Sequence, residues 1–174
     1  MKFLKGQVWI ETVLYSLIAF ALIGMILAFA KPKIEEYQDK GVIEQSIKVL
    51  EEIDYTINNI GTPGNQRTII IKIGKGNLDI NGKNDTLLFN IESRYAYSEY
   101  GQKINVGGIG ALTEKKGRIN KVTLSKNYSA NYNITYKNRD ETGRLGRSAT
   151  PYKILISNKG ESSDRTNINI EIIN

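Results

Sequence analysis

The feature that most constrains this chain is an apolar run close to its N-terminus. Residues 12–30 contain no charged side chain, and residues 8–30 contain only Glu11. A helix over residues 12–30 extends about 28 Å at ~1.5 Å per residue, which matches the hydrocarbon core of a bilayer. Trp9 and Tyr15 lie near one end, where amphipathic rings favour a membrane interface. The run therefore predicts a transmembrane helix over about residues 8–30.

The flanks of the run argue against a cleaved secretory signal peptide. The run is too long for the apolar region of such a peptide, and Lys31-Pro32-Lys33 follows it in place of a small-residue cleavage site. Lys2 and Lys5 precede the run, so both sides are basic and the flanking charges do not decide its orientation. A plain single-span anchor is one interpretation of this segment.

Two further features lead to a second interpretation. Glu11 lies just inside the apolar run, and a charge at the centre of a membrane helix costs ~2.5–3.5 kcal/mol on insertion scales, less near the interface. A carboxylate in such a place is usually retained for a partner. In addition, a short basic leader ends at Gly6, immediately before Gln7. Cleavage after Gly6 would make Glu11 the fifth residue of the product.

This arrangement resembles the class III signal peptide of archaeal type IV pilin-like proteins. The resemblance is carried by Lys5-Gly6-Gln7, by Glu11 and by the apolar helix that follows. The usual pattern of the family is Gln-x-Ser-x-Glu-x-x-x-Leu, and this chain departs from it at Trp9 and Tyr15, which stand where Ser and Leu are usual. The resemblance covers residues 1–60 closely and the rest only in general layout.

The resemblance carries expectations about processing, location and partners. It implies that a prepilin peptidase in the membrane cleaves between Gly6 and Gln7 and leaves the leader, residues 1–6, in the cytoplasm. The precursor would lie in the cell membrane with its N-terminus in the cytoplasm, and the mature chain at the cell surface or in an extracellular filament. Gln7 and Glu11 would serve assembly with further copies of the chain and with the pilus assembly machinery. The implied function is that of a structural subunit of an archaeal type IV pilus-like surface filament, with adhesion as the expected role.

A helical pattern continues beyond the apolar run. Apolar residues recur at three- and four-residue spacings, namely Ile34, Tyr37, Val42, Ile43, Ile47, Val49, Leu50, Ile53, Ile57 and Ile60. Pro32 either kinks one continuous helix or begins a new one, and the kinked continuous helix is the preferred prediction. With a stop at Gly61, one long helix is expected over residues 7–61. Its apolar face from about Ile47 onward is expected to pack on the chain's own C-terminal domain.

Residues 62–174 are predicted to form an extracellular β domain. Strands are expected at Thr68–Ile73, Asn77–Asn81, Thr86–Ser93, Lys103–Val106, Arg118–Ser125, Tyr128–Tyr136, Tyr152–Ser157 and Asn167–Ile173. Turns are expected at Gly74–Gly76, Asn81-Gly82, Gly107-Gly108, Lys116-Gly117 and Asn158–Gly160, and an exposed loop at Arg139–Ala149. The predicted fold class is α+β, with a long N-terminal hydrophobic helix followed by an antiparallel β-sandwich-like domain.

Composition restricts the chemistry that the chain can perform. It has no Cys and no His, which excludes disulfides, zinc–thiolate sites and Ser-His-Asp catalysis. The net charge of +6 is spread along the chain, so nucleic-acid binding is not expected. Gly107–Gly110 lacks the βαβ setting of a dinucleotide site, and Asp79–Asp85 lacks the ligand pattern of a calcium loop, so both are interpreted as turns. We expect no enzyme activity, no cofactor and no metal.

Three Asn-x-Ser/Thr sequons begin at Asn84, Asn127 and Asn133, and each is a candidate N-glycosylation site if the domain faces outward. Asn84 is the best candidate because it lies at a predicted turn. One alternative to the filament subunit stays open. The chain could be a single-span membrane anchor that displays a β-sandwich binding domain, as in a minor pilin, without forming filaments. The mature N-terminus distinguishes the two, since Gln7 indicates a pilin and Met1 an anchor.

Overall fold

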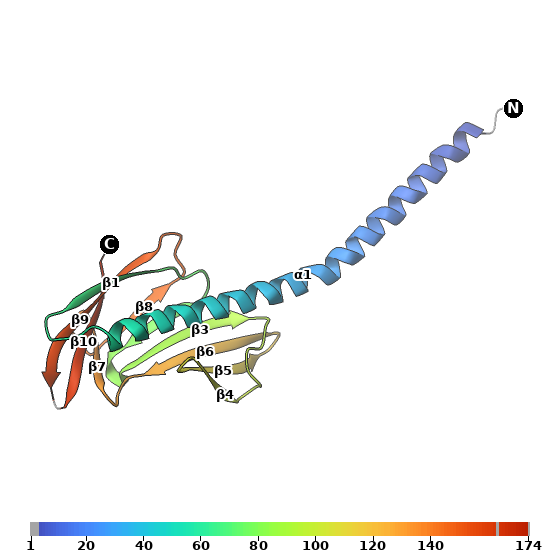
Figure 1. The fold of residues 1–174 in the computed structure, drawn as a ribbon. Coiled ribbons are helices and arrows are strands. Elements are labelled where there is room, and N and C mark those ends of the chain that lie inside the picture. The colour runs from blue at the N-terminus through green and yellow to red at the C-terminus, as the bar shows by residue number, and fades with distance from the viewer. Residues whose placement is uncertain (1–3, 163, 174) are drawn as a thin grey trace. The chain divides into compact units, whose positions relative to one another are not determined.

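A computed structural model describes residues 4–162 and 164–173, with side chains from Val8 onward. The chain divides into two compact units, Met1–Gln38 (unit 1) and Asp39–Asn174 (unit 2). Helix α1, Leu4–Asn58, supplies residues to both (Figure 1). Two β sheets make up the rest of unit 2, and nearly all their strand pairs are antiparallel. The fold confirms the predicted α+β class with a sandwich-like C-terminal domain.

Helix α1 runs through Pro32 as a single element, which agrees with the continuous-helix prediction. A proline within a helix has no N–H to donate to the carbonyl four residues earlier, here that of Ala28. The kink expected at Pro32 stays a prediction. The helix ends at Asn58, and Gly61 follows with a φ of +79°, a backbone conformation that glycine adopts without strain.

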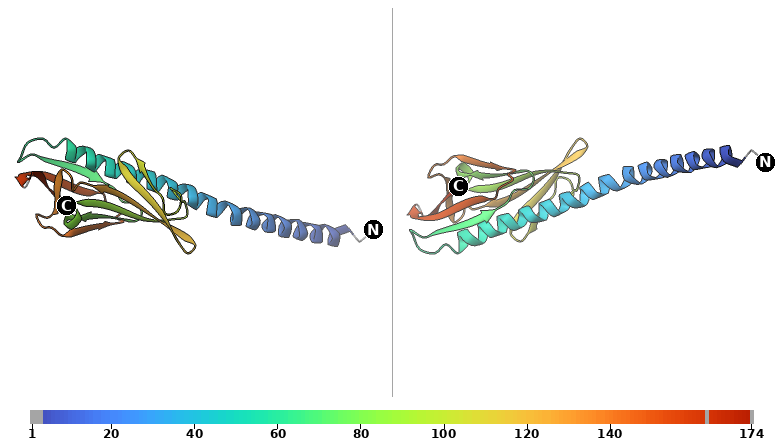
Figure 2. Two further views of the ribbon diagram at one scale, coloured as in Figure 1. Left: turned by 90° about the horizontal axis from the view of Figure 1, so that it is seen from below. Right: turned by 90° about the horizontal axis from the view of Figure 1, so that it is seen from above.

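The strands form a four-stranded and a six-stranded sheet (Figure 2). The four-stranded sheet has the order β1 (Gln66–Ile71), β9 (Tyr152–Ser162), β10 (Arg165–Ile172), β7 (Tyr132–Tyr136). The six-stranded sheet has the order β4 (Lys103–Val106), β5 (Ile109–Lys116), β6 (Ile119–Asn127), β3 (Thr86–Ser93), β2 (Asn77–Asn81), β8 (Thr142–Gly146). Among these strand pairs, β7 and β10 are parallel and the others antiparallel. A short 3₁₀ helix, η1 (Gly82–Asn84), links β2 to β3.

The core of unit 2 lies between the two sheets and one face of α1. The helix contributes Ile43, Ile47, Val49, Leu50, Ile53 and Ile57, and the sheets contribute residues such as Leu78, Phe89, Val122, Ile134, Ile154 and Ile168. Burial on the helix thus begins at Ile43, one turn before the expected Ile47. One turn earlier, Asp39 is also buried and makes polar contacts with unit 2.

Two strands were not predicted. Strand β5 directly follows the Gly107-Gly108 turn. Its first three residues, Ile109–Ala111, are buried, and one of them is a glycine. Strand β8 lies inside the segment Arg139–Ala149, which was expected to be an exposed loop. In β8 the residues Gly143 and Leu145 are buried, while Arg144 binds Asp79 on the neighbouring strand β2. That partner lies 65 residues earlier in the chain, so no local pattern signals it.

Asn81-Gly82 begins the connection of an antiparallel hairpin, as expected, and η1 and Asp85 complete that connection to β3. Two predicted boundaries were wrong. Asn158–Gly160 lies within β9, which runs on to Ser162 past an irregularity in its pairing with β10. Residues 128–131 form a turn before β7, in which the N–H of Tyr132 donates to the carbonyl of Tyr128 at 2.9 Å. In each case a contact with a distant strand or loop sets the boundary.

A partly buried polar cluster joins α1 to β6. The ammonium of Lys126 donates to Asp54 Oδ2 at 2.8 Å. Asp54 Oδ1 and the hydroxyl of Tyr128 are buried, and neither makes a hydrogen bond to the described residues. Burial raises the pKa of the Tyr128 hydroxyl well above its usual range, and the negative charge of Asp54 adds to this. Tyr128 is therefore held neutral in the folded chain.

We predict that Tyr128→Phe stabilises unit 2, most clearly at alkaline pH. In the unfolded chain this tyrosine ionises near its ordinary pKa of about 10, so its contribution to stability is present below about pH 10 and is lost as pH rises further. The substitution abolishes that loss and removes a buried hydroxyl without a partner, which costs about 1 kcal/mol. Urea unfolding of the full chain in detergent at about pH 8 and about pH 11 tests this.

Tyr132→Phe is the matched control for this experiment. The hydroxyl of Tyr132 donates to Asn58 Oδ1 at 3.1 Å, so its removal should destabilise unit 2 by about 0.5–1.5 kcal/mol. A Tyr128→Phe variant that loses stability as steeply as the wild-type chain above about pH 10 would contradict the prediction.

Candidate membrane and assembly segment

The described residues 8–29 are all exposed in the single chain. The exposed large hydrophobic residues among them are Val8, Trp9, Ile10, Val13, Leu14, Tyr15, Leu17, Ile18, Phe20, Leu22, Ile23, Met25, Ile26, Leu27 and Phe29. We call residues 8–30 the apolar segment. A helix that is apolar on every side requires lipid or other apolar helices around it. Within the described part of the chain, α1 is the one helix long and apolar enough to cross a membrane, and its apolar segment is a candidate membrane anchor or signal.

Two hydroxyl groups of the apolar segment, those of Thr12 and Ser16, form hydrogen bonds within the helix. Thr12 Oγ1 donates to the carbonyl of Val8 at 2.8 Å, and Ser16 Oγ donates to the carbonyl of Thr12 at 2.8 Å. Because each of these two hydroxyl groups already donates to a carbonyl of the preceding turn, neither side chain requires water, and both can lie in lipid. Thr12 and Ser16 are therefore compatible with an apolar environment. Glu11 differs from them because it carries a charge.

Glu11 is the one charged residue of the apolar segment, and it lies exposed on the surface of the helix. Gly6 and Gln7, the predicted processing site, lie within the bounds of α1, but their side chains are outside the described residues. Along a helix, Gln7 and Glu11 are one turn apart, a rise of about 6 Å. An amine created at Gln7 by cleavage would therefore lie within reach of the Glu11 carboxylate of the same or a neighbouring chain.

The polar surface of the helix resumes directly after the apolar segment. A shallow hollow of about 350 Å³ lies on the helix surface and is lined by Leu27, Ala30, Lys31, Ile34 and Glu35. One turn on, the ammonium of Lys33 donates to Glu36 at 2.8 Å, and this hydrogen bond raises the pKa of Lys33. The transition from apolar to charged surface within one turn is typical of a helix that leaves a bilayer.

Asp39 fixes the position at which α1 enters unit 2. Its carboxylate is 10% exposed and accepts hydrogen bonds from the ammonium of Lys75 and, at 2.7 Å through Oδ2, from the backbone N–H of Arg94. Lys75 lies in the connection between β1 and β2, and Arg94 follows β3. The sequence analysis missed this site, because the partners lie 36 and 55 residues away and Asp39 is an ordinary polar residue in a helical pattern.

Asp79 and Asp85, the two acidic residues of the segment Asp79–Asp85, form ion pairs within unit 2. Asp79 accepts both bonds of a forked contact from Arg144, at 2.6 and 3.1 Å, and Asp85 accepts from Arg165 at 2.7 Å. Their carboxylates are thus bound by guanidinium groups. Among the described residues, no three of the types His, Cys, Asp and Glu are placed to hold a metal ion.

The glycine-rich segment Gly107–Gly110 begins with a turn, as predicted. Gly107 and Gly108 link β4 to β5 with φ values of +59° and +82°, and the N–H of Gly108 donates to Asn105 Oδ1 at 2.9 Å. Two consecutive positive φ values are typical of a tight hairpin turn. No helix follows, so this segment has no phosphate-binding geometry of the dinucleotide type.

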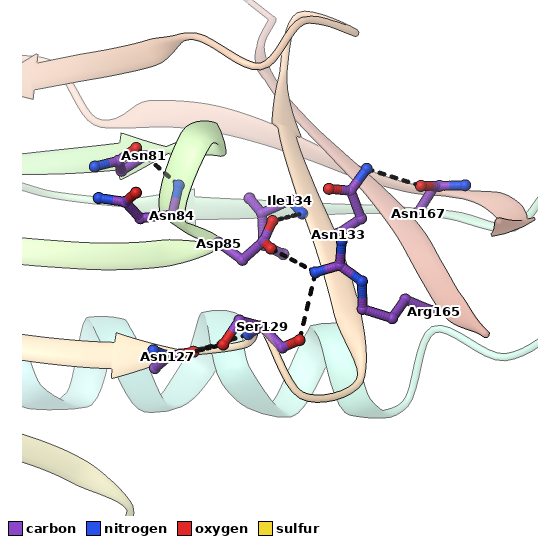
Figure 3. Close-up of polar contacts among 9 residues, drawn as sticks. All are labelled: Asn81, Asn84, Asp85, Asn127, Ser129, Asn133, Ile134, Arg165 and Asn167. Atoms are coloured by element: carbon purple, nitrogen blue, oxygen red, sulfur yellow. Dashed lines mark hydrogen bonds and ion pairs between the residues drawn. The ribbon is translucent and has the colours of Figure 1, made fainter. Parts of the chain in front are cut away.

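The three sequons gather at one end of unit 2, around Asp85 (Figure 3). Thr86, the last residue of the first sequon, pairs with Asn127, the first residue of the second. Asp85 Oδ1 accepts from the N–H of Ile134, the central residue of the third sequon, at 2.8 Å. Arg165 joins the group by donating to Asp85. The structure therefore brings the first sequon beside the other two, which lie more than forty residues later in the sequence.

The three asparagines differ in how accessible their amide nitrogens are. Asn84 is exposed, and its backbone N–H donates to Asn81 Oδ1 at 3.3 Å. Asn127 is exposed, but its Oδ1 accepts from both the N–H and the hydroxyl of Ser129, at 2.8 and 2.7 Å. Asn133 is half-buried, and its Nδ2 donates to Asn167 Oδ1 at 2.9 Å (Figure 3). Modification of Asn133 would replace a hydrogen bond between strands β7 and β10.

We predict that Asn84 is glycosylated ahead of Asn127, and that Asn133 stays unmodified in the folded chain. The physical reason is that the amide nitrogen of Asn133 is the donor of a hydrogen bond inside the sheet. Mass spectrometry of peptides from the native protein would locate the glycans. A glycan on Asn133 beside an unmodified Asn84 would contradict the prediction.

No protein-family model, curated protein or solved structure matches this chain. The assignment of a function therefore depends on the sequence pattern at Gly6 and Glu11 and on the geometry of the apolar segment.

Proposed function

We propose that this chain is the precursor of a structural subunit of an archaeal type IV pilus-like surface filament. The observation that carries the proposal is an apolar segment exposed on every side and preceded by Lys5-Gly6-Gln7, with Glu11 placed near its start. The resemblance to class III signal peptides supports cleavage after Gly6, which would leave the apolar segment on the mature chain.

The physical argument concerns what covers the apolar segment. In the precursor, lipid covers it, and Glu11 lies close to the interface, where water and headgroups lower the cost of its charge. In a filament, the apolar segments of other copies would take the place of lipid, and a buried carboxylate without a partner costs several kcal/mol. The amine of Gln7, present only after cleavage, would offset this cost. Assembly would then depend on processing.

Unit 2 would lie on the outside of the cell and of the filament. It has its own buried core, and its sequons lie at one end where a glycan can project into solvent. The chain lacks His and Cys, so we propose a structural and adhesive role without catalysis or a cofactor. Its partners would be the membrane, the prepilin peptidase, the assembly machinery and further copies of itself.

One observation favours a second candidate function. Because unit 2 encloses its own core, it requires no neighbouring copy to fold. A single-span anchor that displays unit 2 as a binding domain, without filament formation, would have the same fold. The two candidates differ in what they require of Gly6 and Glu11.

The first test is Glu11→Leu. We expect membrane insertion to be unchanged or improved, because a charge is removed from an apolar helix, and unit 2 to stay folded. Filament yield should fall by at least about tenfold, since the charge pair that sets the register is lost. Thr12→Leu is the matched control, because it removes a neighbouring polar group without removing charge. Electron microscopy of cell-surface filaments and membrane fractionation measure the two effects, and normal filaments from Glu11→Leu would exclude the assembly role.

The second test is the N-terminus of the mature chain. We expect mass spectrometry to find a chain that begins at Gln7, and Gly6→Leu to block this cleavage by denying the peptidase its close approach to the backbone. An intact Met1 in the mature protein would favour the single-span anchor. Cleavage near Ala30 would exclude both candidates, because it would remove the apolar segment.

A further inference from the structure

The end of unit 2 at which α1 enters has a distinct set of neighbours. Asp39, the first residue of unit 2, contacts Lys75 and the N–H of Arg94. Arg94 directly follows β3, whose last residue pairs with Asn120 on β6, next to the turn between β5 and β6. The connection from β1 to β2, the end of β3 and the β5–β6 turn therefore meet at one end of unit 2 (Figures 1 and 2). We call this the entrance end.

The entrance end is basic. Its basic residues are Lys75, Arg94, Lys115, Lys116, Arg118 and Lys121, and the acidic residues Asp39, Glu92 and Glu114 form ion pairs with Lys75, Lys116 and Lys121, respectively. The buried Asp39 is already bound to Lys75. Lys116 and Glu92 are 3.2 Å apart, and Lys121 and Glu114 4.0 Å apart, but both pairs are largely exposed and bind weakly. The described residues thus leave an excess of positive charge on this surface.

Three of these lysines line a hollow. Lys75, Lys116 and Lys121 line a surface hollow of about 410 Å³, together with Asn77, Asn90 and Glu92. The lysines come from the β1–β2 connection, from β5 and from β6, so the fold rather than a local sequence run brings them together. A hollow of this size, with several ammonium donors and amide side chains at its wall, suits a phosphate group.

The chain restricts how far the entrance end can lie from the apolar segment. Eight residues lie between Ala30 and Asp39, and the rise of α1 from Ala30 to Asp39 is about 13 Å. The headgroup layer extends about 5–8 Å beyond each side of the hydrocarbon core. The first sequon ends at Thr86, at the opposite end of β3 from Ser93 and the entrance end, and Lys83 and Lys159 do not line this hollow.

We propose that the entrance end binds anionic lipid headgroups while the apolar segment lies in the membrane, with phosphate groups at the hollow formed by Lys75, Lys116 and Lys121. This inference rests on the proposed function, because it requires the apolar segment to be in a bilayer. Each basic residue close to an anionic surface increases binding by about fivefold, and the effect is lost beyond about one Debye length. The contact would hold unit 2 against the membrane for as long as the apolar segment stays in the bilayer.

The experiment is lysine footprinting of the full chain in lipid nanodiscs. The chain is incorporated into discs of phosphatidylcholine alone or with about 30 mol% phosphatidylglycerol, and brief acetylation followed by mass spectrometry gives the reactivity of each lysine. We expect Lys115, Lys116 and Lys121 to react at least about threefold more slowly in the anionic discs, and about 0.5 M NaCl to remove the difference. Lys83 and Lys159 should react equally in both.

A charge variant gives a second readout through Lys121, which it leaves in place. Lys115→Gln, Lys116→Gln and Arg118→Gln combined should abolish the protection of Lys121 in anionic discs. Arg67→Gln, Lys83→Gln and Lys159→Gln combined remove the same charge from exposed positions away from the entrance end, and should leave Lys121 protected. All six residues are exposed, so neither variant disturbs the core.

The outcomes are distinct. Protection that requires anionic lipid, and that the entrance-end variant abolishes, supports the inference. Equal reactivity in the two kinds of disc, with the chain incorporated, would overturn the inference and leave the proposed function standing. Protection in both kinds that rises with the number of chains per disc would overturn it in favour of contact between copies. A chain that does not enter the discs would overturn the proposed function itself, and this inference with it.

Discussion

The structure depends on how the apolar surface of a single helix is covered. From Ile43 to Ile57, one face of α1 is buried against the chain's own two sheets, and this burial supplies a large part of the core of unit 2. Over residues 8–29 the same helix is apolar on every side and has no such cover within the described chain. Water cannot cover it without a large free-energy cost. The helix thus divides into a stretch that the chain's own sheets cover and a stretch that requires lipid or other apolar helices around it.

Buried carboxylates hold unit 2 together at points where the apolar core does not reach. Asp39 binds α1 to the loops at the ends of β1 and β3, Asp79 binds β2 to β8, and Asp85 binds the β2–β3 connection to β7 and β10. Each has a cationic partner and so avoids the cost of an unpaired buried charge. The chain has no Cys, so these ion pairs and the apolar core hold unit 2 together without disulfides.

The sequence predicted those parts of the fold that depend on neighbours in the chain. The apolar run, the helical spacing up to Ile60 and the stop at Gly61 are local signals, and strands β2, β3 and β4 were predicted with their observed bounds. Strand β8 was missed because its formation depends on the contact between Arg144 and Asp79 on the neighbouring strand β2. For the candidate site, Glu11 and the apolar segment were visible in the sequence, whereas the gathering of the sequons and of the basic entrance end depends on strand pairing that no local pattern encodes.

The contact of Asp85 with β7 has a consequence for crowded copies of this chain. Strand β7 lies at the edge of its sheet, and an edge strand offers unpaired N–H groups to any foreign strand that approaches. The N–H of Ile134 on that edge is already taken up by the Asp85 carboxylate. A second molecule therefore cannot extend the sheet there. Where copies of the chain lie side by side, this bonded N–H therefore disfavours pairing between β7 and a strand of another copy.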